Sequence, residues 1–410
     1  MKAARPYPIV TITPKGERAI VDGHPWVYEG EVVSISGTPE DGGLVDVVSK
    51  KGSWLGCGFY NSASKIRVRL VTRNANDDPA GDAFWERRLR YAWDYRKTVM
   101  GEADSRCCRI IFGEADGFPG LTVDRFERVL VAQVLSLGME RIKERVLPLL
   151  VRILREDGQV IRGVYERNDA ALRTLEGMAQ GKGWLVLPGE AAPEGTAEDI
   201  TENGIRYTVD FENGQKTGFF LDQKYNRLAV AKLAKGKTVL DCFTHTRSFA
   251  LNAAMGGAKH VTAVDVSESA VEMARANAAR NGLTGAVDCV AANVFDLLPA
   301  LEKEPKRYDF IILDPPAFTK SRRTVANAIS GYKEINYRAM KLLPRGGLLA
   351  TCSCSHFATE EKFAAMLHSA ARDAGVQLRQ IEARQQACDH PILWGVEETN
   401  YLKFYLFQVV

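Results

Sequence analysis

Short apolar runs alternate with helical stretches from about residue 196 to residue 410. The runs are TVLDCF, HVTAVDV, VDCVAA, YDFIILD, GGLLATCS and the closing YLKFYLFQVV. Strands that are apolar along their whole length are buried on both faces, which is typical of a parallel sheet covered by helices on each side. This rhythm predicts an α/β domain for the second half of the chain.

The first half of the chain has a different rhythm. Residues 1–75 alternate β-like runs such as PIVTITPKG with turns and show no long helix, which predicts a small β-rich domain. A polar stretch at 74–82 has the composition of a linker. Residues 83–195 combine amphipathic helices with short strands, as in an α+β module. Because 410 residues are too many for one typical domain, we expect three domains, at 1–75, 83–195 and 196–410.

The composition is that of an ordinary soluble globular protein. Apolar residues make up 46% and charged residues 26%, and a net charge of +3 says little about partners. No segment approaches about 18 unbroken apolar residues and no signal core follows the first residues, so we expect a cytoplasmic protein that does not enter a membrane. The eight cysteines are too sparse for a disulfide framework and are expected to be thiols.

Polar residues stand where four of the predicted strands end. Asp241 ends the first strand, Asp265 ends the second, Asn293 follows the third and Asp314 ends the fourth. The carboxyl ends of parallel strands share the edge of the sheet where ligands bind. An acidic residue about 20 positions after the first strand commonly holds the hydroxyls of a ribose. Repeated carboxylates at one edge would repel a pyrophosphate, so the sequence predicts a nucleoside ligand with little negative charge.

The loop after the first of these strands restricts the class of possible ligands further. Its sequence, CFTHTRSF, contains no glycine, so the GxGxxG cradle of NAD or FAD is absent. S-adenosylmethionine carries ribose and adenine but no phosphate, and it fits this edge better. The alternative is that Asp241 and Asp265 only cap the helices that follow them.

Four motifs occur in the order found in one enzyme family. They are NGQKTGFFLDQKYNR, VLDCFTHTRSFALNAAMGGAKHVTAVDVSESAVEMARANAARNG, IILDPPAF and TCSCS. Together they resemble the RlmI-like family of class I S-adenosylmethionine-dependent rRNA methyltransferases, which make 5-methylcytosine in 23S rRNA. In the first segment GHPWVYEGEV resembles the PUA domain of this family, and in the second GEADGFPGLTVDRF resembles its central α+β domain.

The resemblance implies a fold and a set of cofactor-binding residues. The implied fold is a Rossmann-like class I methyltransferase sheet, preceded by a PUA-like RNA-binding domain and a central α+β domain. The residues expected to bind S-adenosylmethionine are Asp241, Phe243, Thr246, Ser248, Asp265, Asn293, Asp314 and Phe220.

Two stretches near the expected cofactor pocket leave questions open. The family usually has Thr-Gly-Gly or Thr-Gly-Ser before the phenylalanine of the loop, whereas here Arg247 follows the threonine, so its side chain must point away from the cofactor. By resemblance, the stretch DQKYNR also borders the pocket. From the residues alone, Lys216, Asp222, Gln223 and Arg227 are equally compatible with the start of a surface helix.

The residues after the fourth strand bear on which atom is methylated. The order is Asp-Pro-Pro-Ala-Phe, and Phe318 stands one place later than the aromatic residue of many amino-group methyltransferases, which counts against an exocyclic amine. Carbon 5 of a pyrimidine needs a thiolate that adds to carbon 6 and an acid that protonates nitrogen 3. We expect Asp314 to supply the acid and the next strand to supply the thiol.

Cys352 and Cys354 are the two candidates for this thiol. Counting from the preceding glycine pair to the following glutamate pair, as in related cytosine-5 enzymes, favours Cys354, whereas the local string Thr-Cys-Ser favours Cys352. Both would face the same side of a continuing strand. We prefer Cys354 and assign no base for removing the carbon 5 proton.

Packing and metal binding are the other roles open to cysteines. A cysteine in a buried strand usually acts as a small apolar side chain, which we expect for Cys57, Cys107, Cys108, Cys242 and Cys289. A zinc site would draw on thiols and imidazoles of the C-terminal part, namely Cys352, Cys354, His356, Cys388 and His390. Because Cys-x-Cys in an extended strand is a poor chelating spacing, we expect no metal.

Basic and aromatic residues at two places are candidates for RNA contacts. The run KIRVRLVTR places three cations on one strand face, which is compatible with phosphate binding and equally with a solvated outer face. FTKSRR follows the expected chemistry directly, and its aromatic ring could stack on a flipped base. The candidates are Lys65, Arg67, Arg69, Phe318, Lys320, Arg322 and Arg323.

These observations leave three functions open. The first is an rRNA cytosine-5 methyltransferase acting on 23S rRNA or a large-subunit precursor. The second is methylation of another RNA atom, such as a guanine nitrogen, without a cysteine nucleophile. The third is a non-catalytic RNA-binding or assembly factor of PUA type, in which Arg247 blocks the cofactor loop. A homodimer is compatible with the sequence.

Overall fold

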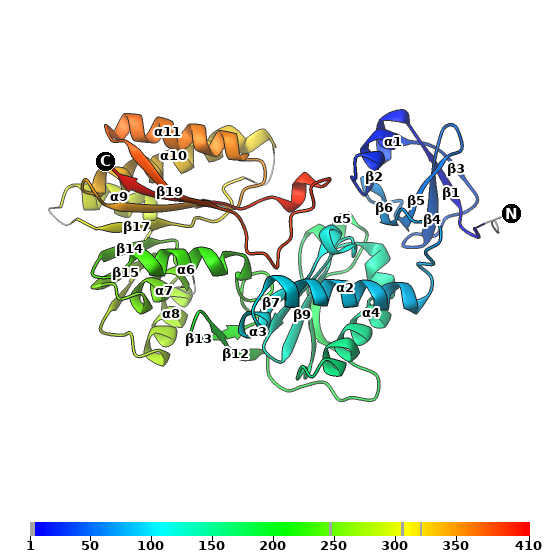
Figure 1. Cartoon of the computed structure of the whole chain (residues 1–410), viewed down its shortest axis with the longest axis horizontal. Helices are drawn as coiled ribbons and strands as arrows, with labels where there is room; N and C mark the ends of the chain where they lie inside the picture. Colours follow the sequence, from blue (N-terminus) through cyan, green and yellow to red (C-terminus); the bar gives the residue numbers. More distant parts are fainter. Residues whose placement is uncertain (1–4, 246–247, 305–306, 320–321) are drawn as a thin grey trace. The chain divides into compact units, whose positions relative to one another are not determined.

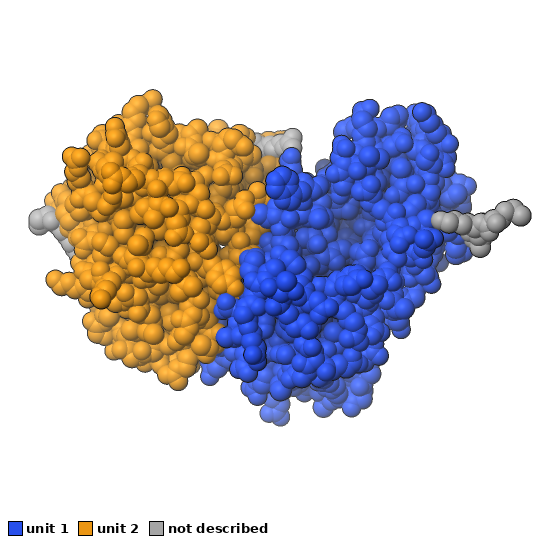
Figure 2. All heavy atoms as spheres, in the orientation of Figure 1, with its two compact units in different colours: residues 1–200, 208–221, 388–399 blue, residues 201–207, 222–387, 400–410 orange. Residues whose placement is uncertain are grey.

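A computed structural model describes residues 5–245, 248–304, 307–319 and 322–410 (Figure 1). The chain divides into two compact units, which are coloured separately in Figure 2. Unit 1 comprises residues 1–200, 208–221 and 388–399, and unit 2 comprises residues 201–207, 222–387 and 400–410. The division into three domains stays a prediction, because the first two expected segments both fall within unit 1.

The first sheet of unit 1 has six strands in the order β2-β6-β5-β4-β1-β3. Their bounds are β1 Ile9–Ile12, β2 Trp26–Tyr28, β3 Val32–Ser36, β4 Leu44–Ser49, β5 Trp54–Tyr60 and β6 Ile66–Thr72. β1 and β4 are parallel, and the other neighbours are antiparallel. Gly58 of β5 allows a close approach, because a Cβ there would lie 2.3 Å from the Arg69 carbonyl oxygen of β6. The expected β-rich character of this part is confirmed.

One helix interrupts these strands where the sequence suggested no long one. Helix α1 (Pro14–Val21) follows β1, and a short turn, η1 (Glu29–Glu31), precedes β3. The Thr13 hydroxyl accepts a hydrogen bond from the Gly16 amide at 3.3 Å, and Pro14 occupies the first turn. Helix α1 is therefore a local consequence of a capping threonine followed by proline.

The second sheet of unit 1 has five strands in the order β11-β10-β9-β8-β7. Its strands are β7 Cys107–Phe112, β8 Leu121–Phe126, β9 Val129–Val134, β10 Gly163–Asn168 and β11 Gly181–Leu185. The helical elements around it are α2 Asp82–Val99, α3 Glu102–Ser105, η2 Gly113–Asp116, α4 Leu137–Glu156 and α5 Leu172–Leu175. A hairpin of β12 (Ala197–Glu202) and β13 (Ile205–Asp210) follows.

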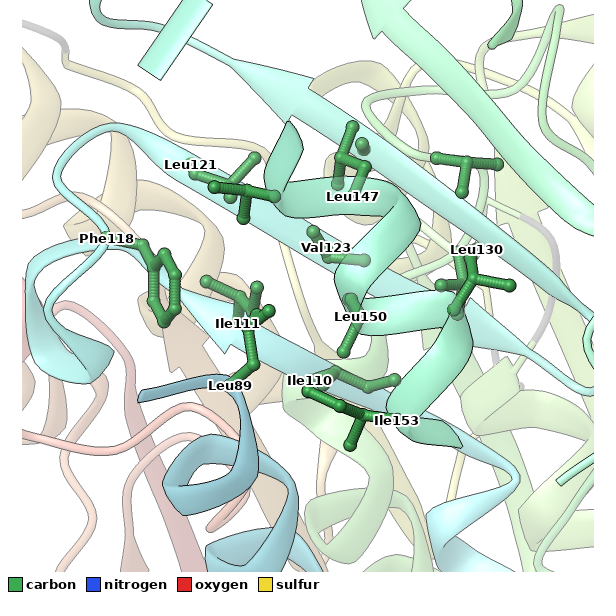
Figure 3. Close-up of a cluster of buried hydrophobic side chains, with 14 of the residues drawn as sticks. Leu89, Ile110, Ile111, Phe118, Leu121, Val123, Leu130, Leu147, Leu150 and Ile153 are labelled. Atoms are coloured by element: carbon green, nitrogen blue, oxygen red, sulfur yellow. The ribbon is translucent and has the colours of Figure 1, made fainter. Parts of the chain in front are cut away.

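Helix α4 closes the core over this sheet. Figure 3 shows Leu147, Leu150 and Ile153 of α4 in one cluster with Val123 of β8 and Leu130 of β9. The three side chains of α4 recur three residues apart, so they form one apolar stripe on the helix. All of these side chains are at most 2% exposed, and the cluster is the main core of unit 1.

The segment 388–399 belongs to unit 1 although its neighbours in the chain belong to unit 2. Asp389 Oδ2 accepts a hydrogen bond from the Arg109 amide at 2.8 Å. The fully buried Arg96 donates through Nη2 to the Asp389 carbonyl at 2.8 Å and through Nη1 to Asp116 at 2.6 Å. Buried charged groups with several hydrogen bonds therefore hold this segment.

Unit 2 is built on a seven-stranded sheet in the order β16-β15-β14-β17-β18-β20-β19. The strands are β14 Thr238–Cys242, β15 His260–Asp265, β16 Val287–Ala291, β17 Phe310–Leu313, β18 Leu348–Ser353, β19 Leu378–Arg384 and β20 Lys403–Val409. The first five are parallel, whereas β20 runs antiparallel to both β18 and β19. The expected α/β fold is confirmed, and the expectation of a wholly parallel sheet is wrong at this edge.

Helices cover both faces of the unit 2 sheet (Figure 1). The helical elements are η3 Leu221–Gln223, which spans the boundary between the units, α6 Lys224–Leu233, α7 Ser248–Met255, α8 Glu268–Arg280, α9 Val294–Glu302, η4 Arg322–Thr324, α10 Val325–Leu342 and α11 Glu360–Ala374. A further short turn, η5 Glu397–Thr399, lies in the segment 388–399 and belongs to unit 1. Helices α6, α7 and α8 lie on one face, and α9, α10 and α11 lie on the other (Figure 1). Among the described helices, none combines the length and the apolar character that a membrane span requires.

We predict that Leu150→Ala destabilises unit 1 strongly. Removing three carbon atoms from a fully buried position leaves a cavity, so the free energy of unfolding should fall by about 2–5 kcal/mol. Urea unfolding followed by tryptophan fluorescence would measure this, because Trp85 and Trp93 lie in the same core. Leu172→Ala, at a side chain that is 58% exposed, is the matched control and should change the value by about 0.5 kcal/mol or less. Equal losses in the two variants would contradict the assignment of this core.

Candidate active site

The carboxylate of Asp241, at the end of β14, organises the loop that follows. It is 1% exposed, and its Oδ2 accepts hydrogen bonds from the Thr244 hydroxyl and, at 3.0 Å, from the Ala250 amide of α7. Asp241 therefore ties the loop to the first turn of the next helix. From the sequence, capping of the following helix was the alternative role of Asp241, and the hydrogen bond from the Ala250 amide to Oδ2 is of this kind.

The loop after β14 is built without glycine and contains two unusual backbone conformations. Phe243 and His245 have φ angles of +64° and +47°, in the left-handed region that side chains with a Cβ rarely adopt. Such conformations persist only where the surroundings fix them, and they cluster at ligand-binding loops. Thr246 and Arg247 lie outside the described residues, so their predicted roles stay predictions.

The next two strand ends also bind backbone amides. The Asp265 carboxylate, at the end of β15, accepts from the His245 amide at 2.8 Å and from the Ser267 amide at 3.0 Å. Asn293 caps α9, with its side-chain oxygen accepting from the Phe295 amide at 3.0 Å. Asp265 thus holds the loop of the neighbouring strand and remains half-buried at the sheet edge.

The remaining predicted cofactor residues fall in different places. Ser248 begins α7, and its hydroxyl accepts from Arg227 Nη1 at 3.3 Å. Phe220 belongs to unit 1, where the Lys216 ammonium lies 5.1 Å from its ring centroid, whereas the other described cofactor candidates belong to unit 2. The role of Phe220 stays a prediction.

A buried polar network surrounds Asp314, the residue that follows β17. Gln223 Nε2 donates to Asp314 Oδ1 at 3.0 Å, and Gln223 Oε1 accepts from Asn226 Nδ2 at 2.6 Å. The Tyr401 hydroxyl donates to Asp222 Oδ2 at 2.6 Å. Burial, and then the negative charge of Asp222, raise the pKa of Asp314 to about 7. A substantial fraction of Asp314 is therefore protonated at neutral pH.

The same network corrects one alternative from the sequence. Asp222, Gln223 and Arg227 were compatible with the start of a surface helix, but their exposures are 7%, 3% and 1%. Arg227 forms a buried ion pair with Glu202, with Nη2 at 2.7 Å from Oε1. The polar composition of DQKYNR is typical of an exposed segment. Only the fold shows that these side chains are buried in unit 2.

Cys352 and Cys354 occupy different environments. Strand β18 ends at Ser353, so Cys352 lies within the ladder and Cys354 follows it. Cys352 is fully buried, and burial together with the nearby charge of Asp314 holds the pKa of its thiol well above the usual value. Cys354 is half-buried, with its Sγ 4.0 Å from the Pro315 carbonyl oxygen. Because reactive cysteines are partly exposed and structural ones are buried, this contrast favours Cys354 as the reactive thiol.

The other cysteines include buried packing residues and two that are half-buried. Cys57, Cys107, Cys108 and Cys242 are buried, as expected, whereas Cys289 is only half-buried. Cys388 Sγ donates to the Val99 carbonyl in unit 1 at 3.4 Å. Among the residues that the structure describes, no group of three or more metal-ligating side chains could hold an ion.

Phe318, which follows β17, lies in an aromatic cluster. Its ring centroid is 4.6 Å from that of Tyr332, 5.8 Å from that of Phe295 and 6.4 Å from that of Phe243. The Tyr332 hydroxyl lies 2.9 Å from Ser355 Oγ, next to Cys354. Of the neighbouring cations, Arg323 is exposed, Lys320 lies outside the described residues, and the Arg322 side chain is likewise not described.

The basic face predicted on β6 is largely neutralised. Arg67 is paired with Glu29 at 2.9 Å, and Arg69 is paired with Glu114 at 3.3 Å and Glu176 at 2.9 Å. Both arginine side chains are only 12% exposed. Lys65 is exposed. Carboxylates from other elements therefore pair with two of the three cations, and the role of all three in RNA binding stays a prediction.

The described polar residues at this edge of the sheet fit S-adenosylmethionine. Asp241, Asp265 and Asp314 are carboxylates, which repel phosphate groups and accept hydrogen bonds from hydroxyl and amino groups. The loop after β14 contains no glycine that would let its amides approach a pyrophosphate. A nucleoside carrying a positively charged sulfonium therefore suits this edge.

Comparisons with known proteins also indicate an S-adenosylmethionine-dependent enzyme. Residues 10–73 match the model of a PUA-like domain, and residues 183–408 match that of an S-adenosylmethionine-dependent methyltransferase. The ribosomal RNA large subunit methyltransferase I of Klebsiella pneumoniae is 36% identical over 98% of this chain and 99% of its own length. The protein of that name from Aeromonas salmonicida is 38% identical over 94% of this chain and 96% of its own length.

Solved structures show the same fold over the whole chain. A Streptococcus mutans protein described as an S-adenosylmethionine-dependent methyltransferase has a TM-score of 0.80 with this chain at 22% identity, covering 98% of this chain and 99% of its own. A second solved chain with the same TM-score of 0.80 is a complex with SAH. The arrangement of strand ends, the domain matches and the full-length relatives lead to one conclusion: the chain belongs to the S-adenosylmethionine-dependent methyltransferase family, in the group of ribosomal RNA large subunit methyltransferase I, and its methyl donor is S-adenosylmethionine.

Proposed function

We propose that this protein methylates carbon 5 of a cytosine in 23S rRNA, with Cys354 as the nucleophile and Asp314 as the acid. The observation that carries the proposal is the position of the half-buried Cys354 thiol, 4.0 Å from the carbonyl of Pro315, the residue that follows Asp314. The names of the full-length relatives support large-subunit rRNA as the substrate. The PUA-like domain supports binding to RNA.

The proposed reaction begins with a bond between Cys354 and the base. The thiolate of Cys354 adds to carbon 6, and nitrogen 3 takes a proton from Asp314, so that electron density collects at carbon 5. S-adenosylmethionine, when bound, would supply an electrophilic methyl group, and its sulfur would keep the electron pair of the broken carbon–sulfur bond as the neutral thioether. After methylation of carbon 5, loss of its proton re-forms the carbon 5–carbon 6 double bond and expels Cys354 as thiolate, and nitrogen 3 returns its proton to Asp314.

The raised pKa of Asp314 suits the role of acid. A carboxyl with a pKa of about 7 holds its proton in part of the molecules at neutral pH and can accept it back. Gln223, which donates to Oδ1, fixes the orientation of the carboxyl. An enzyme that methylates a guanine nitrogen would need neither the thiolate of Cys354 nor a carboxyl that gives a proton to the base and takes it back.

We predict that Cys354→Ala abolishes methylation, with a loss of about 10³-fold or more, because the covalent route disappears. Transfer of labelled methyl groups to 23S rRNA, followed by mass spectrometry of the nucleosides for 5-methylcytidine, would measure it. Cys352→Ala is the matched control and should keep activity within a few-fold, because that thiol is buried. Full activity of Cys354→Ala would exclude the covalent mechanism, and a methylated guanine in place of cytosine would exclude the proposed base.

We predict that a 5-fluorocytosine in the target RNA traps the enzyme. Fluorine at carbon 5 cannot leave as a proton does, so the bond between sulfur and carbon 6 should persist after methyl transfer. The measurement is an RNA–protein complex that survives denaturing gel electrophoresis, with the modified peptide identified by mass spectrometry. The adduct should map to Cys354 and be absent from Cys354→Ala, and an adduct on Cys352 would reassign the nucleophile.

We predict that Asp314→Asn lowers the methylation rate by about 10²-fold or more, because the amide is a very poor proton donor.

The same variant tests the environment of the carboxyl. Since folding raises the Asp314 pKa from 3.8 to about 7, the folded state binds more protons than the unfolded state between these values, and stability falls as pH rises through this window. The melting temperature of Asp314→Asn relative to wild type should therefore be higher at pH 8 than at pH 5. Glu272→Gln, which removes an exposed carboxylate, is the control and should show no such trend.

A further inference from the structure

One lysine begins an otherwise apolar final strand and lies inside unit 2. Lys403 is the first residue of β20, is 7% exposed, and stands opposite Ser353 of β18 in the antiparallel register. Its Nζ donates to the Ser355 carbonyl and to the Tyr401 carbonyl, each at 2.8 Å. The ammonium is therefore fixed against the residue that follows Cys354.

Packing alone does not account for an ammonium at this position. Burying a charge costs free energy, and both acceptors named above are neutral carbonyls rather than carboxylates. Burial lowers the pKa of Lys403 to about 8, while the negative charges of Cys354 and Glu360 act to raise it. The charges that favour the ammonium are those of Glu360 and, when it is ionised, Cys354.

Several elements besides its own strand surround Lys403, including β19, where Arg384 stands opposite the neighbouring Phe404. Cys354 lies in the turn after β18, Glu360 begins α11, and Tyr332 on α10 contacts Ser355. On β20 itself, the Tyr405 hydroxyl donates to Glu360 Oε1 at 3.0 Å. The Glu360 carboxylate is thus engaged by a phenol, and Cys354 is the reactive group in this set.

We propose that Lys403 is the charge partner of the Cys354 thiolate, holding a larger fraction of this thiol ionised at neutral pH. Electrostatic coupling is reciprocal, so an anion at Cys354 that favours the ammonium is itself favoured by the ammonium to the same extent. The inference rests on the proposed function insofar as Cys354 is the nucleophile. Lys403 acts through Cys354 and is a positioning residue rather than a group that touches the base.

This pairing also bears on the end of the proposed reaction. When sulfur bonds to carbon 6 it loses its negative charge, and the ammonium loses the anion that stabilises it. When the carbon 5–carbon 6 double bond re-forms, the sulfur takes back the electron pair as thiolate beside the cation. Lys403 therefore favours both the attacking and the leaving form of Cys354 over the neutral thiol.

Alkylation of the full-length protein tests the pairing without RNA or methyl donor. Iodoacetamide forms a carbon–sulfur bond with a thiolate and releases iodide, so its rate against pH follows the thiolate fraction. Peptide mass spectrometry resolves Cys354 from the other thiols, with the half-buried Cys289 and Cys388 as internal controls. In Lys403→Met the midpoint for Cys354 should rise by about one pH unit, and the rate at pH 7 should fall about tenfold, with both controls unchanged. Lys403→Arg should restore the wild-type midpoint, because it keeps the charge.

A second variant guards against misfolding. Lys403→Gln keeps a donor for the Ser355 carbonyl, and continued protection of the buried Cys242 and Cys352 from alkylation reports an intact unit 2. An unchanged midpoint in folded Lys403→Met or Lys403→Gln would overturn the pairing. Methylation that survives in Cys354→Ala would instead overturn the proposed function, while the alkylation midpoint would still report on the pairing. For methylation itself, the activity of Lys403→Gln should recover as pH rises, which a merely structural role would not produce.

Discussion

The parallel alignment of β14, β15, β17 and β18 is the constraint on which the site depends. Because these strands run in the same direction, the polar residues at their ends emerge at one edge of a sheet whose interior is apolar. Asp241 and Asp265 fix the cofactor loop there, while Asp314 and the turn containing Cys354 follow two neighbouring strands. Strand direction therefore brings the candidate site residues to one edge of the unit 2 sheet.

Much of this arrangement could be predicted from the sequence, because strands and strand ends leave local signals. The apolar runs predict six strands of a parallel sheet, of which five are parallel, and the four polar positions discussed above lie at or just after the ends of these strands. Strand β19 was missed because most of its residues are exposed and polar, so it lacks an apolar run. The antiparallel direction of β20 was missed because a short apolar run carries no mark of its direction.

The side-chain partners were the least predictable part. Arg67 and Arg69 alternate with apolar residues as a solvated strand face would, but they are paired with carboxylates from distant elements. Asp222 and Gln223 resemble surface residues by composition and are buried around Asp314. Long-range pairing of charges depends on tertiary structure, so neither periodicity nor spacing reveals it.

The choice between Cys352 and Cys354 shows how sequence and structure complement each other. Counting along the motif favoured Cys354, and the end of β18 at Ser353 supplies a physical reason, since one thiol stays in the ladder and the other leaves it. Which of them ionises more readily is then a matter of local electrostatics. Burial disfavours the thiolate of Cys352, and the proposed pairing with Lys403 favours that of Cys354, so both effects point to the same thiol.

The interleaving of the two units has a consequence for how this chain can be divided. The chain passes from one unit to the other five times, after residues 200, 207, 221, 387 and 399. A fragment cut at any single position between the first and last of these crossings would carry incomplete parts of both units. No single cut in this range therefore separates one intact unit from the other.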